Sequence, residues 1–484
     1  MQHKHLDIII IGAGLSGIDA ACHFKMKCSH KSFTIFEARD TIGGTWDLFK
    51  YPGIRSDSDM HTFSYSFKPW TYHKSISDGE TIMHYLKETV EEYKITDHIL
   101  FNHKISSGSW SSETKTWTIE GFDATKGEKF IATSNFVMLC TGYYDYDEGY
   151  TPDYKGFENF KGKFVHPQNW TENTVYENKE VVVIGSGATA VTLVPTMADK
   201  TKHITMLQRS PTYVLDRPLY DTFSKFAHKI FPSKLAHSLA RWKSIFEQIF
   251  IFNMSRKNPE GVKKYVKKKI VKILGKDYDV DTHFSPKYDP WDERLCVVPD
   301  NDLFYAIKEK KCSIVTDEIA RFTNNGILLK SGKELPADLI ISATGLKIKM
   351  LGGISIKVDG IEVDFSKKVN YKGIMLQDLP NAVFIVGYTN ASWTLKADLI
   401  CIYVCRLLKY MDKKGYKICA PKLKDKDLIL EPIIDFSSGY IARAKAMLPK
   451  QGNKIPWRLH QNYVKDLFML KHQKIDDGVL EFKR

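Results

Sequence analysis

Short apolar runs recur along the chain between polar segments, and two of them lead directly into a glycine-rich turn. Residues 8–11 precede Gly12-Ala-Gly14-Leu-Ser-Gly17, and residues 181–184 precede Gly185-Ser-Gly187-Ala-Thr-Ala190. In a strand–turn–helix unit of this kind, the first glycine makes the tight turn, the second lets the backbone approach a pyrophosphate, and the third small residue lets the helix pack on the strand. Amide groups at the helix N-terminus then bind the anion. The pattern therefore predicts two dinucleotide sites in one chain.

The residue that ends the strand after each turn distinguishes the two ligands. Glu37 follows strand 33–36, about 20 residues past the last glycine, where a carboxylate accepts hydrogen bonds from a ribose diol. The first site thus favours an adenosine without a 2′-phosphate, as in FAD. Gln208 and Arg209 follow strand 204–207, and a guanidinium there suits the 2′-phosphate of NADPH. The alternative, in which Glu37 and Arg209 are ordinary solvated charges at strand ends, stays open.

The rest of the pattern predicts an α/β fold with two Rossmann-like dinucleotide-binding domains, for FAD and NADP, and a helical insertion. Further strands are expected at residues 136–139, 313–315, 327–329, 338–342 and 383–386, and a helix at 394–411, whereas residues 214–293 lack a strand–helix rhythm and look helical. We expect one domain to interrupt the other. The predicted division assigns residues 1–147 and 381–484 to the FAD-binding domain and C-terminal region, 157–213 and 294–380 to the NADP-binding domain, and 214–293 to the insertion.

The composition is that of a large globular enzyme. Of the 484 residues, 43% are hydrophobic and 26% are charged, and the length allows several domains. The eight cysteines form no C-x-x-C pair and show no metal-ligand spacing with histidine, which predicts reduced, buried thiols and no metal site. The N-terminal residues lack a signal-peptide core, and no stretch of 18 or more uncharged apolar residues occurs. We therefore expect a cytoplasmic protein that does not span a membrane.

The excess of basic residues, 70 Lys and Arg against 57 Asp and Glu, concentrates in residues 262–274. The spacing there predicts a basic amphipathic helix, with an apolar stripe of Val262, Val266, Ile270 and Ile273 or Leu274 among Lys263, Lys264, Lys267, Lys268, Lys269 and Lys272. Two interpretations remain open. The helix contacts an anionic membrane peripherally, at the inner face of the cell membrane, or, as we favour, it packs its apolar side on the protein. No motif indicates nucleic-acid binding or a protein partner.

Several segments resemble motifs of one flavoprotein family. Residues 160–170 match the F-x-G-x-x-x-H-x-x-x-W fingerprint of the Baeyer-Villiger monooxygenases, with Thr171 where that family usually has Pro or Asp. The pattern from Gly43-Gly-Thr-Trp46 through Tyr51-Pro-Gly53 to Asp57 also matches. Residues 53–60, 290–296 and 387–396 extend the resemblance to the subgroup of ethionamide-activating monooxygenases. The resemblance covers nearly the whole chain.

This resemblance implies an NADPH-dependent flavin monooxygenase that uses O2, through a C4a-peroxyflavin, to convert small apolar ketones into esters or lactones, with side activity on thioethers. The helical insertion and the loop around Trp393 are expected to form the pocket walls. A flavin-containing N- or S-monooxygenase is one alternative, and a membrane-associated nucleotide-binding protein without catalysis is another. A flavin disulfide reductase is disfavoured, because Cys22 and Cys28 lack the spacing of a redox pair.

The expected cofactor-binding residues lie in the two turns and in the motif segments. Around the first turn they are Gly12, Gly14, Ser16, Gly17, Glu37, Thr45, Trp46, Arg55, Ser56, Asp57 and Ile105. Around the second turn they are Gly185, Ser186, Gly187, Ala188, Thr189, Ala190, Gln208 and Arg209.

Arg294 and Asp57 are the expected catalytic residues. The peroxide must stay anionic to attack a carbonyl carbon, so it needs a permanent cation, and arginine is never deprotonated in proteins. The resemblance places Arg294 there, with Asp57 orienting the guanidinium. The alternative is that residues 291–294 only connect a helix to a strand and form a surface ion pair. His166 is expected to be either an interdomain hinge or a structural residue that binds backbone.

Overall fold

The first large sheet forms around the N-terminal apolar strand. In the computed structural model, which describes residues 5–72, 74–293, 295–434 and 439–484, β1 (Leu6–Ile11) pairs in parallel with β2 (Phe33–Phe36) and β6 (Glu128–Leu139). Alternate residues of β1 face opposite sides, so Ile8 and Ile10 enter one core cluster and Ile9 and Ile11 another. Burial on both faces explains the unbroken isoleucine run.

The order of strands in this sheet is β20–β19–β4–β5–β6–β1–β2–β3, and β23 also pairs with β6. Its other members are β3 (Ile99–Leu100), β4 (His103–Ser111), β5 (Thr116–Asp123), β19 (Ser355–Val358), β20 (Ile361–Glu362) and β23 (Ala382–Phe384). The pairing of β19 with β4 shows that the chain has returned to the first sheet by residue 355, before the expected boundary at 381. Strand β19 has only four residues, and so short a pattern does not predict which sheet the strand joins. We propose a domain boundary between β17 (Leu339–Ser342) and β19, and the rest of the predicted division stays a proposal.

The second sheet is entirely parallel, with the order β13–β10–β9–β17–β8. Its strands are β8 (Lys163–Val165), β9 (Glu180–Ile184), β10 (His203–Gln208), β13 (Cys312–Thr316) and β17 (Leu339–Ser342). A three-stranded antiparallel sheet adjoins it, formed by β14 (Ile319–Thr323), β15 (Gly326–Leu329) and β16 (Glu334–Pro336). Two parallel-strand units, each with a strand, a glycine-rich turn and a helix, confirm the predicted fold class.

Helices cover both sheets. In the first domain, α1 (Leu15–Lys27) packs against α11 (Trp393–Lys414) and α4 (Gly79–Glu92), and in the second, α5 (Ala188–Met197) packs beside α10 (Asp302–Lys308). The shorter helices are α2 (Thr45–Leu48), α3 (Met60–Phe63), α12 (Gly439–Ala444) and α13 (Tyr463–Leu467). The remaining strands form two-stranded pairs: β7 (Tyr144–Gly149) with β18 (Leu346–Ile348), β21 (Asn370–Tyr371) with β22 (Met375–Leu376), β24 (Ile418–Pro421) with β27 (Leu480–Lys483), and β25 (Leu430–Pro432) with β26 (Lys450–Gly452).

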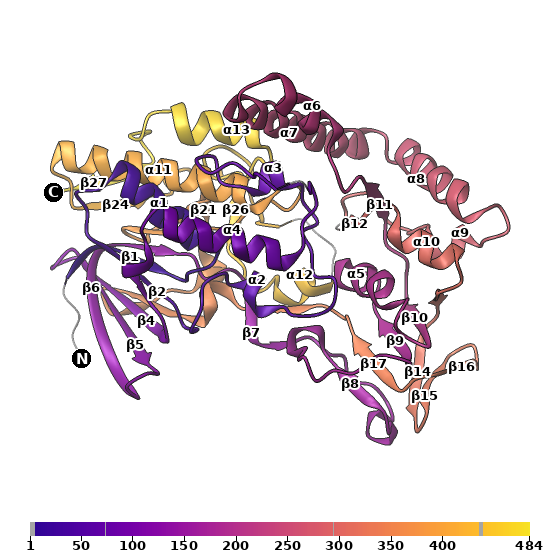
Figure 1. Cartoon of the computed structure of the whole chain (residues 1–484). Coiled ribbons are helices and arrows are strands. Elements are labelled where there is room, and N and C mark those ends of the chain that lie inside the picture. The colour runs from indigo at the N-terminus through magenta and orange to yellow at the C-terminus, as the bar shows by residue number, and fades with distance from the viewer. Residues whose placement is uncertain (1–4, 73, 294, 435–438) are drawn as a thin grey trace.

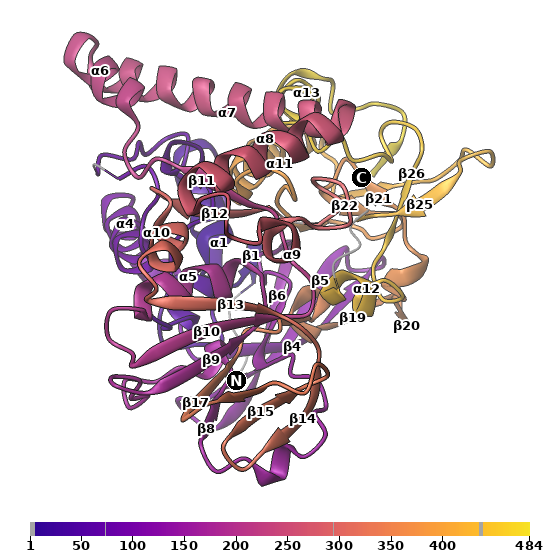
Figure 2. The ribbon, with the colours of Figure 1, turned by 90° about the vertical axis from the view of Figure 1, so that its right-hand side faces the viewer.

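The helical insertion lies between two strands that pair in parallel, β11 (Val214–Arg217) and β12 (Cys296–Pro299). The start of the range that was expected to be helical, residues 214–217, is therefore a strand, which its pairing with β12 stabilises. It contains α6 (Thr222–Ile230), α7 (Ser233–Lys257), α8 (Pro259–Leu274) and α9 (Val280–Phe284). Figures 1 and 2 show α6 and α7 along the upper edge of the molecule, outside both sheets. Buried Arg241 of α7 donates hydrogen bonds to the carbonyl oxygens of His61 (3.0 Å) and Ser64 (2.6 Å), which fixes the insertion on the first domain.

The basic helix α8 packs its apolar side on the protein, as the favoured interpretation expects. Val266 and Ile270 are buried in the core of the second domain, and the rest of the stripe packs against that core. Lys263 pairs with Asp289 (2.6 Å) and Lys267 with Asp281 (2.5 Å). In the described part of the chain, no helix has both the length and the hydropathy that a bilayer crossing requires.

Candidate active site

The first glycine-rich turn joins β1 to α1 as predicted. Gly12 has a φ of 101°, and a Cβ atom there would lie 2.7 Å from the carbonyl oxygen of Cys140, so a side chain does not fit. Gly14 is the N-cap residue of α1, and within the described residues no side chain caps this end. The first amides of α1 are therefore available to an anion.

Glu37 holds this turn from the end of β2. Its Oε2 accepts a hydrogen bond from the backbone N–H of Ala13 (2.6 Å), and its Oε1 accepts one from that of Arg39 (2.9 Å). Burial raises the pKa of the Glu37 carboxyl group above its ordinary value, and both N–H donors oppose that change. The side chain is buried and hydrogen-bonded, so it is not a solvated strand-end charge. A carboxylate has lone pairs left for further donors, which suits a ribose diol.

The second turn repeats this geometry at the end of β9. Gly185 has a φ of 134°, and a Cβ atom there would lie 2.3 Å from the carbonyl oxygen of Ala343. Ala190, in the third small position, is fully buried, while Gly187 and Ala188 are exposed. The Ser186 hydroxyl donates to the carbonyl oxygen of Ser210 (3.1 Å). The turn is thus rigid on its protein side and open on its solvent side, as a phosphate site requires.

The two residues after β10 lie in different surroundings. Gln208 is buried, and its Nε2 donates to the carbonyl oxygen of His283 (2.8 Å) and the hydroxyl of Thr316 (2.9 Å). Arg209 is exposed. Burial raises the pKa of Glu293 and the charge of Arg209 opposes this change, while the hydrogen bond from Lys330 lowers the pKa of Glu318 and Arg209 adds to that change. Arg209 therefore has the exposure that a phosphate ligand needs, whereas the amide nitrogen of Gln208 bonds within the domain.

The motif residues next to the first turn form a polar and aromatic cluster. Trp393, at the start of α11, donates its Nε1–H to the Ser16 hydroxyl (2.9 Å) and stacks on Tyr143 with ring centroids 5.3 Å apart. The hydroxyls of Thr45 and Tyr146 are hydrogen-bonded (3.2 Å). These contacts join segments of the first domain that are distant in sequence.

Trp46 and Ile105 are held by packing. The Trp46 ring meets Phe63 edge-on at 5.5 Å between centroids. Ile105 is buried in β4, where the pairing with β5 shifts by one residue before Ser107. Such a bulge exposes backbone groups, which is compatible with the expected backbone contact of Ile105.

The loop from residue 51 to residue 57 connects the two dinucleotide domains. Arg55 donates from Nη1 to Asp302 Oδ2 on α10 (2.6 Å), and Gly53 lies so close to α5 that a Cβ atom there would be 2.1 Å from Thr196 Oγ1. Tyr51 is hydrogen-bonded to Thr189 of the second turn. The buried Ser56 hydroxyl donates to the carbonyl oxygen of Ser58 (2.6 Å). The structure thus assigns Arg55 an interdomain ion pair.

A cavity of 780 Å³ lies between this loop and the insertion. Asp57, β11, α7, α8 and the loop at 389–391 line it. The insertion thus forms a wall of this cavity as expected, whereas Trp393 itself lines a different pocket. Trp291 also lines it, with a φ of 74° that is unusual for a bulky residue, and its ring meets Phe252 edge-on at 5.5 Å. Backbone strain of this kind concentrates at functional sites. Arg294 lies outside the described residues, so its expected role stays a prediction.

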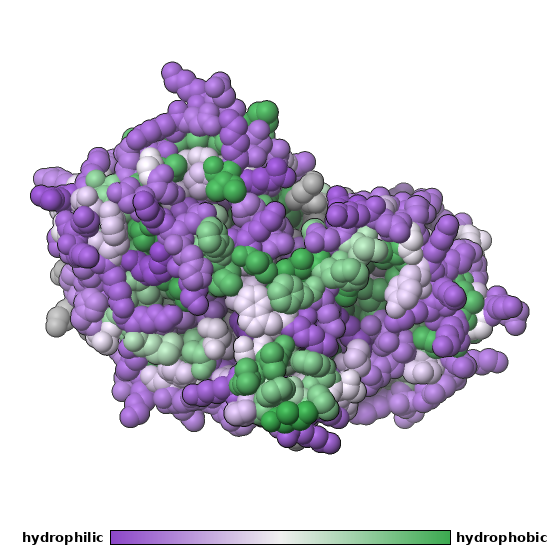
Figure 3. Space-filling view, turned by 90° about the horizontal axis from the view of Figure 1, so that it is seen from above, coloured by the Kyte–Doolittle hydropathy of each residue, from purple (hydrophilic) through white to green (hydrophobic). Residues whose placement is uncertain are grey.

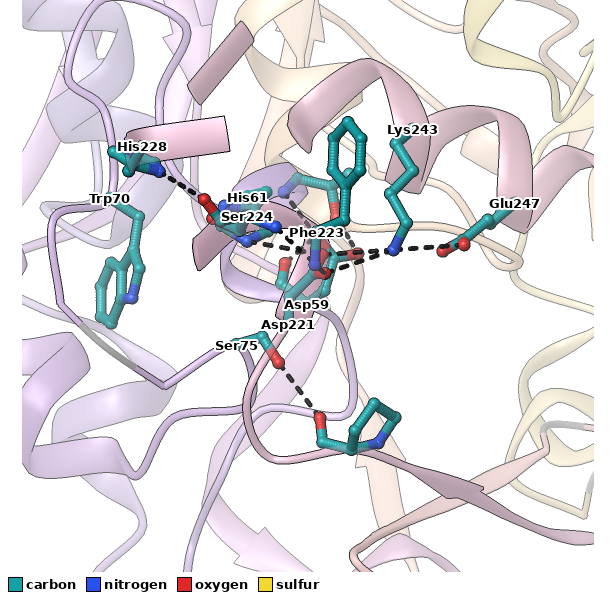
Figure 4. Close-up of polar contacts among 12 residues, drawn as sticks. Asp59, His61, Trp70, Ser75, Asp221, Phe223, Ser224, His228, Lys243 and Glu247 are labelled. Atoms are coloured by element: carbon teal, nitrogen blue, oxygen red, sulfur yellow. Dashed lines mark hydrogen bonds and ion pairs between the residues drawn. The ribbon is translucent and has the colours of Figure 1, made fainter. Parts of the chain in front are cut away.

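A network of polar contacts fixes the insertion beside this cavity (Figure 4). Asp221 caps α6 by accepting hydrogen bonds from the backbone of Phe223 (2.9 Å) and Ser224 (3.3 Å). Lys243 of α7 pairs with Asp221 (3.3 Å) and Glu247 (3.2 Å), and these three charged side chains line the cavity. The part of the insertion around Asp221 and Lys243 therefore presents charged side chains to the cavity.

A buried ion pair supports the segment that ends in Lys396. Lys396 Nζ lies 2.7 Å from Asp466 Oδ2, and the Tyr388 hydroxyl donates to the same oxygen at 2.7 Å. The carboxylate and burial together raise the pKa of Tyr388 well above its ordinary value, burial being the larger cause. Sequence analysis missed this pair, because the two charges lie 70 residues apart and neither belongs to a periodic pattern.

His166 binds backbone on both sides of its ring. Its Nε2 is hydrogen-bonded to the carbonyl oxygen of Gly345 (3.1 Å), and its Nδ1 accepts from the backbone N–H of Gln168 (3.2 Å). Burial lowers its pKa. These contacts match the structural interpretation and join segments that connect the two domains.

Residues 5–384 match the family model of flavin-binding monooxygenase-like proteins. The chain belongs to this family. It is 48% identical to the FAD-containing monooxygenase EthA of Mycobacterium tuberculosis over 482 residues, 99% of this chain and 98% of that protein. It is also 48% identical to the probable FAD-binding monooxygenase AlmA of Acinetobacter baylyi over 486 residues, 100% and 97% of the two chains.

The fold of this flavin monooxygenase is similar to two solved structures. Cyclohexanone monooxygenase from Rhodococcus sp. Phi1 gives a TM-score of 0.78 at 18% identity, with 99% of each chain covered. A steroid monooxygenase gives 0.73 at 20% identity, covering 87% of this chain and 88% of that one. Together with the family match and the 48% identical relative, these structures confirm the resemblance that the motifs indicated and the predicted class of flavin monooxygenase.

Proposed function

We propose that this flavin monooxygenase binds FAD and NADPH and converts small apolar ketones into esters or lactones with O2, and that it also oxidises thioethers. The observation that carries the proposal is the 780 Å³ cavity at Asp57, enclosed by the insertion in a chain that has both glycine-rich turns. A relative named as FAD-containing and structural neighbours described as bound to NADP support the cofactors.

The residues present fit both cofactors. Gly12 and Gly185 have positive φ angles, and a Cβ atom at either position would clash with a carbonyl oxygen, so each turn requires glycine there. Glu37 presents a buried acceptor to the first turn. Exposed Arg209 supplies the charge that distinguishes NADPH from NADH.

Each group of residues has a separate task in the proposed reaction. FAD, when bound, supplies the redox chemistry that links NADPH oxidation to O2. The first turn and Glu37 bind its pyrophosphate and ribose, and the second turn and Arg209 bind NADPH. Arg294 provides a permanent positive charge for the negative charge that develops on oxygen near the substrate carbonyl, and Asp57 orients it. The insertion excludes water from the cavity.

Product analysis tests this function. The purified protein should be yellow, prefer NADPH to NADH, and form ester or lactone from linear or cyclic ketones under air. Oxidation of thioethers or amines with no ester from any ketone would favour the alternative flavin-containing N- or S-monooxygenase. A colourless protein that does not oxidise NADPH after incubation with FAD would refute the proposal.

Peripheral contact between α8 and an anionic membrane, at the inner face of the cell membrane, also remains a proposal. Lys264 and Lys268 of α8 are exposed, and their attraction to acidic lipid would weaken with salt. Because the apolar stripe of α8 packs on the core, this contact would rest mainly on charge.

A further inference from the structure

Apolar side chains are exposed on the two helices that precede α8. On α6 they include Phe226 and Ile230, and on α7 they include Phe246 and Phe250, with exposed fractions between 57% and 65%. Figure 3 shows apolar side chains gathered over α6 and α7 among polar surroundings. Most exposed apolar residues on soluble domains are scattered singly, so a group of this kind marks an interaction surface.

The exposed positions follow the helical period. Phe246, Phe250 and Met254 are spaced by four residues and share one face of α7, whereas Ala240 and Ser244 on another face are buried against the protein. One side of α7 therefore packs on the first domain, and the other presents an apolar stripe outward.

The charge of the insertion indicates what this stripe contacts. Helices α6, α7 and α8 contain thirteen Lys and Arg residues and two acids. Arg241 is buried, and Lys243, Arg256, Lys263 and Lys267 pair with carboxylates. The exposed cations include Lys225, Lys229, Lys234, Lys264 and Lys268. An apolar stripe flanked by basic side chains is complementary to the surface of an anionic lipid bilayer, where the apolar residues enter the acyl boundary and the cations meet the headgroups.

The same stripe borders the cavity. Phe250 and Met254 of α7 and Tyr265 of α8 line the cavity and are also exposed at its surface, and Asp57 lines that same cavity. The mouth of the cavity is thus apolar and lies on the face that carries the stripe.

We propose that the apolar face of α6 and α7 docks on an anionic bilayer and that apolar substrates enter the cavity directly from the membrane between α7 and α8. The entry of substrate rests on the proposed function, whereas the docking does not. Substrates of this enzyme are then ketones or thioethers that dissolve in lipid.

Vesicle binding tests the docking. The variant Phe226→Glu, Ile230→Glu, Phe246→Glu changes exposed residues that do not line the cavity, and Ile361→Glu, at a 74% exposed apolar residue of β20, is the matched control. Co-sedimentation with phosphatidylglycerol-containing vesicles should fall at least about tenfold in the triple variant and stay unchanged in the control. Lys264→Glu, Lys268→Glu should weaken binding at low salt only.

Three outcomes would overturn the docking proposal. These are no binding of the unmutated protein to acidic vesicles, equal binding by the triple variant, or a concentration-dependent dimer that the triple variant abolishes. Circular dichroism spectra and melting temperatures of all variants establish that each is folded.

Substrate entry is tested with two ketones, one soluble in water and one long-chain ketone dissolved in the vesicles. The triple variant should oxidise the water-soluble ketone at the unmutated rate and lose most of its rate on the vesicle-dissolved one. Equal losses on both ketones, or none on either, would refute entry from the membrane. If the unmutated enzyme oxidises neither ketone yet binds vesicles, the proposed function fails and the docking stands.

Discussion

Replacement of Lys396 by methionine should strongly destabilise the first domain. The Lys396 ammonium and the Asp466 carboxylate are both at least 95% buried, and they lie 2.7 Å apart. Methionine would leave the carboxylate with the Tyr388 hydroxyl as a donor, while Asp466 Oδ1 has no hydrogen-bond partner among the described residues. Removing one partner of a buried ion pair costs about 3–5 kcal/mol.

A second substitution separates this charge effect from a packing effect. Lys396→Met combined with Asp466→Asn removes both charges and keeps an acceptor for Tyr388, so the loss should shrink to about 1–3 kcal/mol, the cost of imperfect hydrogen bonding. Lys367→Met is the matched control, because Lys367 is exposed and pairs with exposed Asp364 at 3.2 Å. It should leave stability unchanged.

Urea unfolding followed by circular dichroism provides the measurement, with the free energy of unfolding taken from the midpoint and slope of the first transition. The reasoning would be refuted if Lys396→Met were as stable as the unmutated protein, or if the double variant lost as much stability as the single one.

Three further predictions concern the cofactor sites and pH. Arg209→Ala should raise the KM for NADPH by roughly tenfold to a hundredfold and leave the KM for NADH unchanged, since a charge-assisted phosphate contact contributes about 1.5–3 kcal/mol. Arg321→Ala, at another exposed arginine, is the control. Equal KM values for the two coenzymes in the unmutated enzyme would contradict the assignment. Arg294→Ala should still oxidise NADPH but form hydrogen peroxide in place of ester, with a loss of about 3–4 kcal/mol of transition-state stabilisation; ester formation at the original rate would exclude this role. Burial, with Arg241 nearby, lowers the pKa of His237 to about 3, so the unfolded chain binds a proton below pH about 6.5 that the folded one does not. As the pH is lowered from about 6.5 to about 3, the free energy of unfolding should therefore fall by at most about 1.4 kcal/mol per pH unit. In acid unfolding curves, His237→Gln should make this dependence on pH weaker.

The sequence alone determined those features that are contained in one short segment. The turns at Gly12 and Gly185, the strands before them and the position of Glu37 were all predicted correctly, because a strand, a glycine turn and a helix are specified by adjacent residues. The run of consecutive apolar residues in each strand fits the burial that the structure shows on both of its faces. The family followed from motifs of the same local kind.

The tertiary structure decided which distant segments meet. Trp393 reaches Ser16 across 377 residues, and Arg55 reaches Asp302 across 247. The cavity at Asp57 forms only when the insertion folds over the first domain. These contacts depend on strand order and on the packing of helices, and neither leaves a periodic signal in the sequence, because many chain paths place the same local elements together. The sequence therefore determines the turns and strands that adjacent residues specify, and the tertiary fold determines the shape of the site.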